Sequence, residues 1–338
     1  WLRISPVKVS GETITCIYND FLTVMPGEGP AISRVRILSY DIEAVPFVVD
    51  SGNTLFPQPE RDPICTIGIA CYEYGTSNME LHALSVGETT GNWTRDDDVC
   101  RDDYDPSQVK LHTFLTEGHM LLFFSDFIRA YDPDFISGYN ILNFDNFYTL
   151  KRAAYICNDG RAQQWGRTND ICVPEKRFTS SNQLGGREFW DVRITGREWF
   201  DLYNICKVDH KLRSYKLDNV AESLLGTNKI HISYDDIPMM CKTPDGRKRL
   251  AVYCVKDAFL PLQICIKLCK LQNHVSLSFV TGAPLDHILN RGQQIRTLNL
   301  IVRYVRTHTP RLYVPDRSQE NTDGFQGAVV IEPIKGFY

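Results

Sequence analysis

The sequence lacks several features that mark whole classes of protein. Its 338 residues carry 37 Lys plus Arg against 41 Asp plus Glu, so it has no basic excess that would indicate nucleic-acid binding by charge alone. It contains no Cys-x-x-Cys pair, which argues against a zinc finger, and its 11 cysteines are an odd set in a long chain, which argues against a disulfide scaffold. No apolar run approaches the roughly 18 residues of a membrane-spanning helix, and no internal repeat is present.

The composition is that of a globular protein with a large core. Hydrophobic residues make up 43% of the chain, aromatic residues 11% and charged residues 23%. Cys254, Cys265 and Cys269 lie in apolar runs, as small hydrophobic residues do, and this usage suits the reducing cytosol or nucleus. The length is typical of about two domains.

Apolar periodicity predicts strands first and then strands and helices in alternation. Runs rich in β-branched and aromatic residues predict strands at 13–18, 35–45, 64–74, 79–86 and 134–140. Apolar spacings of three and four predict helices at 110–131, 145–157, 215–225, 247–272 and 285–307. The polar stretches 95–105 and 159–186 predict surface loops. This order indicates an α/β fold with a mixed sheet covered by helices.

Two acidic residues share one face of the predicted strand 35–45. Because side chains alternate along a strand, Asp41 and Glu43 point the same way, while Tyr40 and Ile42 point to the opposite face. Neighbouring like charges on an apolar strand repel each other unless a cation compensates them, and Mg²⁺ and Mn²⁺ prefer carboxylate oxygens. The alternative is a solvated strand edge that carries both acids without a metal.

A third acid interrupts the apolar stripe of the predicted helix 247–272. The stripe recurs at steps of three, four and seven residues: Leu250, Tyr253, Asp257, Leu260, Ile264, Leu268 and Leu271. Asp257 is therefore expected to face the core, where a carboxylate is costly unless something pairs with it. Tyr253 lies one turn earlier and places a phenol beside it. The alternative is a structural salt bridge.

A fourth acid stands where a predicted strand passes into a helix. The run from Asn140 through Phe144 ends at Asp145, which would be the first residue of that helix. The alternative is a plain N-cap without any role in chemistry.

Taken together, these segments resemble family B DNA polymerases. Asp41-Ile42-Glu43, the Asn140-x-x-x-Phe144-Asp145 run and Tyr253-x-x-x-Asp257 are similar, in order and context, to the Exo I, Exo II and Exo III motifs of that family. Further stretches resemble its delta-type catalytic subunits: 56–63, 136–140, 211–217, 249–254, 291–294 and 327–333. The likeness runs from about residue 34 to the end of the chain.

The resemblance implies an RNase H-like (DnaQ-like) 3′-5′ exonuclease fold that removes mispaired nucleotides from a primer 3′ end during DNA replication. It implies two Mg²⁺ or Mn²⁺ ions held by four carboxylates. Asp41 would bridge the ions, Glu43 and Asp257 would complete the site of the ion that activates the nucleophile, and Asp145 would hold the second ion directly or through water. Tyr253 would orient the water or the scissile phosphate.

The same resemblance implies contacts to DNA and a larger assembly. Asn140 and Phe144 would hold the frayed single strand, and Lys229 would offset phosphate charge. The implied partners are the frayed primer 3′ end, the remainder of the polymerase (palm, fingers and thumb) and accessory subunits, but no membrane. The implied location is the nucleus or a viral replication site in a host cell.

The resemblance also divides the chain. We expect 1–34 to end an N-terminal region, 35–290 to form the exonuclease domain and 291–338 to connect toward a polymerase palm. The palm motif of relatives, which resembles Asp-x-x-Ser-Leu-Tyr-Pro-Ser, does not occur here, so this chain alone is not expected to polymerise. One departure lies directly after Asp145, where Asn146-Phe147 replaces the usual apolar-Pro pair and leaves the local helix start open.

Two other functions stay open at this point. A catalytically inactive exonuclease fold could serve as a scaffold that binds DNA or polymerase subunits, although it would have no reason to keep a costly cluster of four acids. A free-standing nuclease of the same fold is disfavoured by the likeness after residue 290. Basic residues at Lys207, Lys211, Arg213, Lys216 and 247–249 could meet DNA phosphates or form a solvated face.

Overall fold

The computed structural model describes residues 35–49, 54–90, 106–181, 185–227 and 232–307, together with four short strands before residue 27 and Gly336. The chain divides into two compact units, Trp1–Leu268 and Cys269–Tyr338. The domain boundaries expected at residues 34 and 290 stay a prediction. No helix among the described residues is long and apolar enough to cross a membrane.

The first unit is built on a mixed sheet of six strands in the order β12-β9-β5-β6-β7-β8. The strands are β5 (Arg36–Ala44), β6 (Ile64–Glu73), β7 (Met79–Val86), β8 (Val109–Phe114), β9 (Phe135–Gly138) and β12 (Glu198–Asp201). β5 pairs antiparallel with β6 and parallel with β9, and β7 pairs antiparallel with β6 and parallel with β8. β12 runs parallel to β9. The expected mixed α/β sheet is confirmed.

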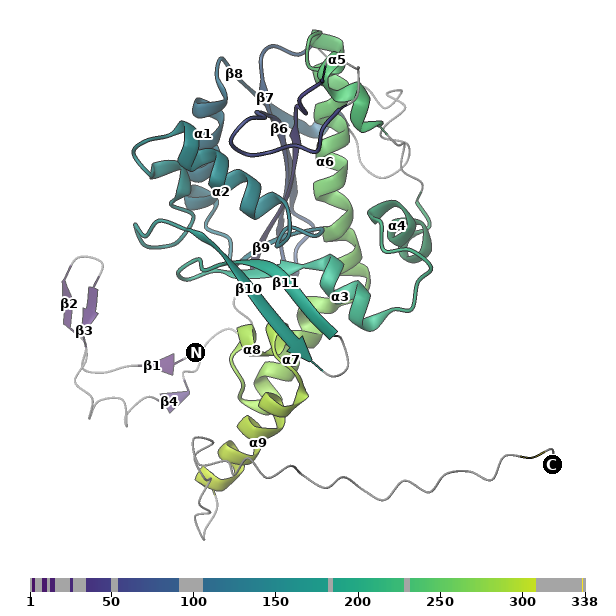
Figure 1. Cartoon of the computed structure of the whole chain (residues 1–338). Coiled ribbons are helices and arrows are strands. Elements are labelled where there is room, and N and C mark those ends of the chain that lie inside the picture. Colours follow the sequence, from purple (N-terminus) through teal and green to yellow (C-terminus); the bar gives the residue numbers. More distant parts are fainter. Residues whose placement is uncertain are drawn as a thin grey trace. The chain divides into compact units, whose positions relative to one another are not determined.

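Helices cover both faces of this sheet (Figure 1). On one side, α1 (Glu117–Tyr131) and α2 (Asp145–Ile156) pack on a core that contains Tyr40 and Ile42 of β5. The predicted alternation along β5 is therefore confirmed. The core includes a cluster of aromatic rings, in which Tyr40 lies 5.2 Å from Phe124 and 6.0 Å from Trp165 between ring centroids.

On the other side lies α6 (Pro244–Lys267), which is buried without interruption from Leu250 to Leu262. A helix that is buried all round needs partners on every side. The sheet covers one side of α6, and three smaller helices contact it elsewhere: α3 (Leu202–Asp209), α4 (Leu217–Leu225) and α5 (Ile237–Met240). Thr243 begins α6 as its N-cap, because its side chain accepts a hydrogen bond from the Gly246 N–H at 3.1 Å.

The remaining elements are short strands, one hairpin, single turns and the helices of the second unit. They are β1 (Leu2–Arg3), β2 (Lys8–Ser10), β3 (Thr13–Thr15), β4 (Met25–Pro26), β10 (Pro174–Ser181), β11 (Gly185–Val192), 3-10 turns at Pro106–Gln108, Arg161–Gln163 and Tyr234–Asp236, α7 (Lys270–Thr281), α8 (Leu285–Asn290) and α9 (Gln293–Thr307). In the second unit α7 packs on α8 and α9, and the Arg303 guanidinium donates to the Phe279 carbonyl at 2.6 Å.

Several sequence predictions were wrong in detail. The expected loop 159–186 contains the β10 strand and the start of β11, and it buries Trp165 completely. The expected helix 110–131 is strand β8 followed by α1, which begins after the N-cap Thr116. The expected helix 247–272 breaks at Cys269, whose φ of 48° lies in the left-handed region and ends the helical path. The expected helix 285–307 is likewise two helices, α8 and α9. The acidic run 95–105 lies outside the described residues.

Candidate active site

Three of the predicted acids converge on one point between β5 and α6. One carboxylate oxygen from each of Asp41, Glu43 and Asp257 lies within 4.8 Å of the other two. Asp41 and Glu43 are half-buried on β5, and Asp257 is 7% exposed on α6. Within the described residues, this is the one group of at least three potential metal ligands that comes together.

A main-chain contact brings α6 this close to the sheet. Gly68 of β6 pairs with Asp41 across the sheet, and a Cβ added to Gly68 would lie 2.3 Å from the Cys254 carbonyl oxygen. Only glycine therefore allows the helix backbone to lie directly on the strand. Because Asp257 follows Cys254 by about one helical turn, this close approach places its carboxylate next to that of Asp41.

The Cys254 thiol reinforces the contact. Its Sγ accepts a hydrogen bond from the Gly68 N–H at 3.1 Å and donates to the Asp41 carbonyl at 3.2 Å. Burial raises the pKa of this thiol well above its ordinary value, and the charges of Asp41, Glu43 and Asp257 raise it further. The thiol therefore stays protonated and acts as a neutral hydrogen-bonding group.

The fourth acid, Asp145, lies beside the cluster at the start of α2 and is 3% exposed. Burial raises the pKa of Asp145 to about 7, and the charges of Asp201 and Asp257 add to the rise, although hydrogen bonds from its own N–H and from the Ile42 N–H lower it. The Ile42 contact ties this carboxyl to the residue next to Asp41. Asp145 lies outside the group of three acids, but it is close enough to Asp257 for that charge to raise its pKa.

The other predicted site residues surround these acids. Tyr253 is 8% exposed and lies on α6 one turn before Asp257. Asn140 lies in the turn between β9 and α2 with φ of 64°, and Phe144 is half-buried directly before α2. Lys229 lies outside the described residues.

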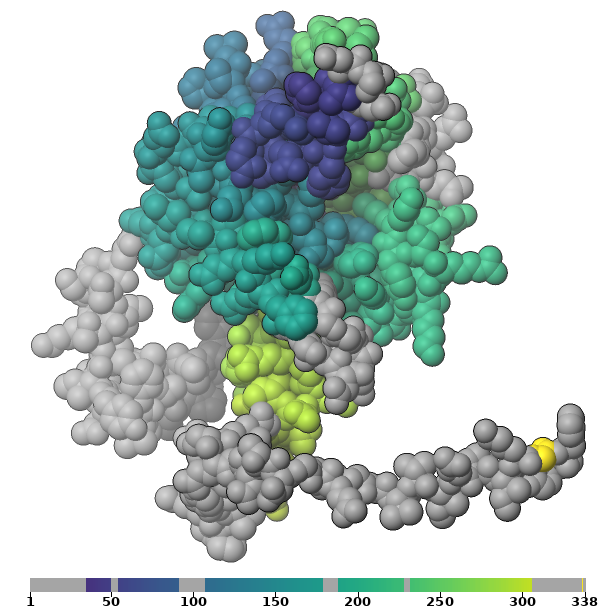
Figure 2. Space-filling model, viewed as in Figure 1, coloured from purple at the N-terminus to yellow at the C-terminus, as the bar shows by residue number. Residues whose placement is uncertain are grey.

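Sequence reasoning missed two residues that the structure connects to Asn140 and Phe144. Asp201 accepts hydrogen bonds from the Asn140 N–H at 2.8 Å and the Tyr203 N–H at 3.0 Å, so it holds the turn before α2 while it caps α3. Phe56 is 68% exposed, and its ring lies 5.8 Å from that of Phe144 in a T-shaped pair. The sequence signal that could have identified Phe56 is an aromatic residue between prolines and polar residues, where a ring is expected to be exposed. The segment that carries it, in dark purple, lies on the surface in Figure 2.

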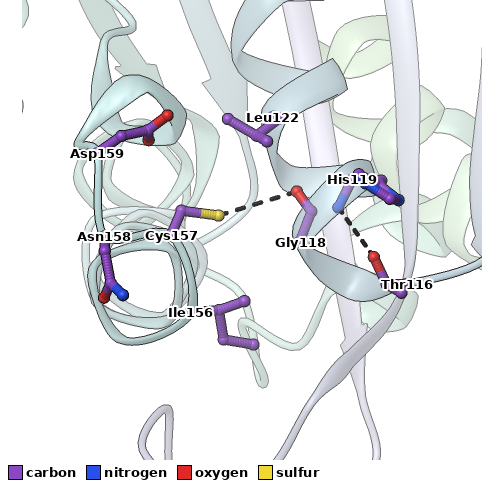
Figure 3. Close-up of a pocket in the computed structure, with 8 residues that line it drawn as sticks. All are labelled: Thr116, Gly118, His119, Leu122, Ile156, Cys157, Asn158 and Asp159. Atoms are coloured by element: carbon purple, nitrogen blue, oxygen red, sulfur yellow. Dashed lines mark hydrogen bonds between the residues drawn. The ribbon is translucent and has the colours of Figure 1, made fainter.

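A separate cavity of about 360 Å³ lies between the start of α1 and the end of α2 (Figure 3). It is lined by Thr116, Gly118, His119, Leu122, Ile156, Cys157, Asn158 and Asp159. Two of its polar contacts are internal: the His119 N–H donates to the Thr116 hydroxyl at 3.3 Å, and the Cys157 thiol approaches the Gly118 carbonyl at 3.8 Å. None of the clustered acids lines this cavity.

The chemistry of the donor set fits a metal ion. Three carboxylates within 4.8 Å of one another repel each other, and a cation between them removes that repulsion. Oxygen-only ligands suit hard divalent ions such as Mg²⁺, Mn²⁺ and Ca²⁺ rather than ions that prefer sulfur. The acid cluster could therefore hold a divalent metal ion.

The mixed sheet, its two helical layers and the acid cluster define the class as an RNase H-like exonuclease domain. The profile described as "DNA polymerase family B, exonuclease domain" matches residues 5–220. The chain therefore belongs to the family B DNA polymerases and carries their exonuclease domain. The match ends before α6, so geometry and not this profile connects Asp257 with Asp41 and Glu43.

Relatives with curated names agree with this family. The chain is 34% identical over 328 residues to a DNA polymerase delta catalytic subunit of Schizosaccharomyces pombe. This alignment covers 95% of this chain and 28% of the relative. The chain is 33% identical over 333 residues to that of Mesocricetus auratus, in an alignment that covers 96% of this chain and 28% of the relative. It is 34% identical over 356 residues to that of Bos taurus, in an alignment that covers 100% of this chain and 30% of the relative. The chain spans less than a third of the length of these relatives.

Proposed function

We propose that this chain is the proofreading 3′-5′ exonuclease portion of a delta-type DNA polymerase, which removes mispaired nucleotides from the primer 3′ end. The observation that carries the proposal is the convergence of Asp41, Glu43 and Asp257, which come from segments far apart in the sequence. The family of the chain and its similarity to polymerase delta catalytic subunits support the same reading.

In this proposal the four acids are the ligands of two Mg²⁺ or Mn²⁺ ions. When bound, such a pair neutralises charge on the scissile phosphate and lowers the pKa of the attacking water. In this proposal Asp41, Glu43, Asp257 and Asp145 would hold the ions, with Asp41 shared between them, Glu43 and Asp257 on the nucleophile side, and Asp145 on the other side directly or through water. The Tyr253 hydroxyl orients the attacking water or the scissile phosphate.

Aromatic and amide groups near α2 hold the frayed single strand. Phe144 and the exposed Phe56 form a pair of rings on which a base can stack, and Asn140 supplies an amide for a base edge or the backbone. Lys229 offsets phosphate charge in this proposal. The exposed cations Lys211 and Arg213 lie in a segment tied to the turn before α2, because the Tyr139 hydroxyl donates to the Tyr215 carbonyl at 2.6 Å. They add electrostatic attraction for phosphates.

The larger context follows from the length of the relatives. Polymerase activity would reside in the remainder of a longer protein, with palm, fingers and thumb as partners of this domain and with accessory subunits beyond them. Residues 35–290 would form the exonuclease domain, 1–34 the end of a preceding region and 291–338 the connector toward the palm. The site of action would be the nucleus or a viral replication site.

The test uses this 338-residue chain with a single-stranded DNA labelled at its 5′ end. We expect Mg²⁺ or Mn²⁺ to support stepwise loss of 3′ nucleotides and Asp41→Ala with Glu43→Ala to abolish it. Without metal the double variant should melt at the same or a higher temperature, because like-charge repulsion is removed. Asp126→Ala with Glu175→Ala is the matched control, because it removes two exposed acids elsewhere. A wild type that binds DNA but releases no nucleotides would favour an inactive scaffold.

A further inference from the structure

A buried hydrogen bond links the two segments that carry Asp41 and Asp145. The Tyr40 hydroxyl donates to the Asn146 Oδ1 at 2.6 Å, and both side chains are fully buried. Tyr40 directly precedes Asp41 on β5, and Asn146 directly follows Asp145 on α2. The bond therefore joins the immediate neighbours of two carboxylates that come from different secondary-structure elements.

A second contact runs beside it. The Asp145 carboxyl accepts a hydrogen bond from the Ile42 N–H, on the other side of Asp41. The first two residues of α2 thus bind the two residues that flank Asp41. Two contacts therefore connect the start of α2 with the segment of β5 around Asp41, in addition to the packing of α2 on the core.

Tyr40 can act as a fixed reference point because its ring is held in the aromatic core by Phe124 and Trp165. Asn146 is held from its own side, because its backbone N–H donates to the Ile141 carbonyl at 3.0 Å.

Stability alone does not account for this pair. The Asn146 Nδ2 is buried without a hydrogen-bond partner among the described residues, which costs stability. Replacing both members of a buried polar pair by apolar groups of similar shape can be close to neutral. The hydrogen bond adds a defined distance and direction between β5 and α2, which an apolar contact does not.

We propose that Tyr40 and Asn146 are positioning residues that set the spacing between the Asp41 and Asp145 carboxylates for metal binding. This inference rests on the proposed function, in which both acids serve the metal pair. Groups behind metal ligands commonly change metal affinity by about 10- to 100-fold when they are removed. The loss of this hydrogen bond should therefore be visible in metal binding before it is visible in the stability of the fold.

The test is a double-mutant cycle of Tyr40→Phe, Asn146→Leu and the combined variant. The measurements are melting temperature in EDTA, Mn²⁺ binding by titration calorimetry, and kcat and KM on single-stranded DNA. We expect the combined variant to melt within about 3 °C of the wild type. Its Mn²⁺ affinity should fall about 10-fold and its kcat about 10- to 100-fold, with KM unchanged.

Tyr148→Phe is the matched control. It deletes the hydroxyl of another buried tyrosine on α2. That hydroxyl donates to the Asp62 carbonyl at 2.8 Å, in the segment before β6, and not to β5. We expect the control variant to change stability but not Mn²⁺ affinity. If the combined variant folds and keeps wild-type Mn²⁺ affinity and kcat, the positioning role is wrong. Should Asn146→Leu be too unstable to purify, Tyr40→Phe alone decides the question by the same readouts.

The outcomes separate this inference from the proposed function. A wild type that binds Mn²⁺ but never cleaves DNA would refute the exonuclease assignment, while the Mn²⁺ titrations of the variants would still decide the positioning role. A wild type that cleaves DNA, beside a combined variant with unchanged affinity and kcat, would refute the positioning role alone.

Discussion

The contact between α6 and the sheet at Gly68 leads to a quantitative prediction for Gly68→Ala. An added Cβ would lie 2.3 Å from the Cys254 carbonyl oxygen, whereas ordinary van der Waals contact begins near 3.4 Å. The helix must therefore move by 3.4 − 2.3 Å, which is about 1.1 Å. The obstacle on the other side is backbone rather than a flexible side chain, so no local rotation relieves the clash.

This displacement acts on the acid cluster directly. Asp257 follows the point of contact by one turn, and its oxygen must stay within 4.8 Å of those of Asp41 and Glu43. A shift of about 1 Å in a catalytic group commonly costs about 100-fold in rate. Overpacking costs about 1–3 kcal/mol, which corresponds to a melting temperature lower by roughly 1–5 °C in a protein of this size.

The assay compares Gly68→Ala with Gly292→Ala, a position where an added Cβ meets nothing within 4 Å. Melting temperature in EDTA reports the packing cost, Mn²⁺ titration reports the geometry of the acids, and release of 3′ nucleotides reports catalysis. We expect Gly68→Ala to lose metal affinity and rate even below its melting temperature, and Gly292→Ala to match the wild type. A folded Gly68→Ala protein with wild-type Mn²⁺ affinity and rate would refute the argument.

Three further predictions test the DNA contacts and the buried acid. Phe56→Ala should raise KM for single-stranded DNA about 5- to 160-fold with little change in melting temperature, because it removes an exposed ring whose proposed stacking on a base would contribute about 1–3 kcal/mol. Lys211→Ala with Arg213→Ala should weaken DNA binding and make the slope of log affinity against log salt shallower by about 1–2, as measured by fluorescence anisotropy. In EDTA, the wild type should lose stability relative to Asp145→Asn as the pH rises from about 4 through 7, because the folded-state pKa of about 7 exceeds the ordinary 3.8. The limit of that loss is about 4 kcal/mol, and chemical denaturation at several pH values measures it.

How much the sequence predicts depends on whether the signal is local. The alternation along β5 places Asp41 and Glu43 on one face, and the stripe on α6 places Asp257 toward the core; both follow from periodicity, and the structure confirms them. The family likeness supplied the connection between these segments. The hairpin of β10 and β11 and the buried Trp165 were missed, because two strands that pair mainly with each other need no apolar alternation.

Long-range contacts were the other gap. Nothing local to Gly68 indicates that it lies under Cys254, since one is a strand residue and the other belongs to a distant helix. The role of Asn146 was equally hidden: its sequence context suggested a doubtful helix start, whereas α2 begins at Asp145 and Asn146 points to Tyr40. Such residues are recognised only when the partner element is placed against them.

The three contacts that link the segments carrying the acids share a chemical property. The Gly68 amide with the Cys254 thiol, the Ile42 amide with Asp145, and Tyr40 with Asn146 all use neutral donors. Neutral donors connect these segments without adding a positive charge beside the carboxylates, so the negative charge remains available to a divalent ion. Hydrogen bonds of this kind are also far less sensitive to ionic strength than pairs of exposed charges. Raising salt from about 50 to 200 mM should therefore weaken strand binding while it leaves the arrangement of the acids unchanged. An exonuclease built this way loses activity at high salt through KM rather than through kcat.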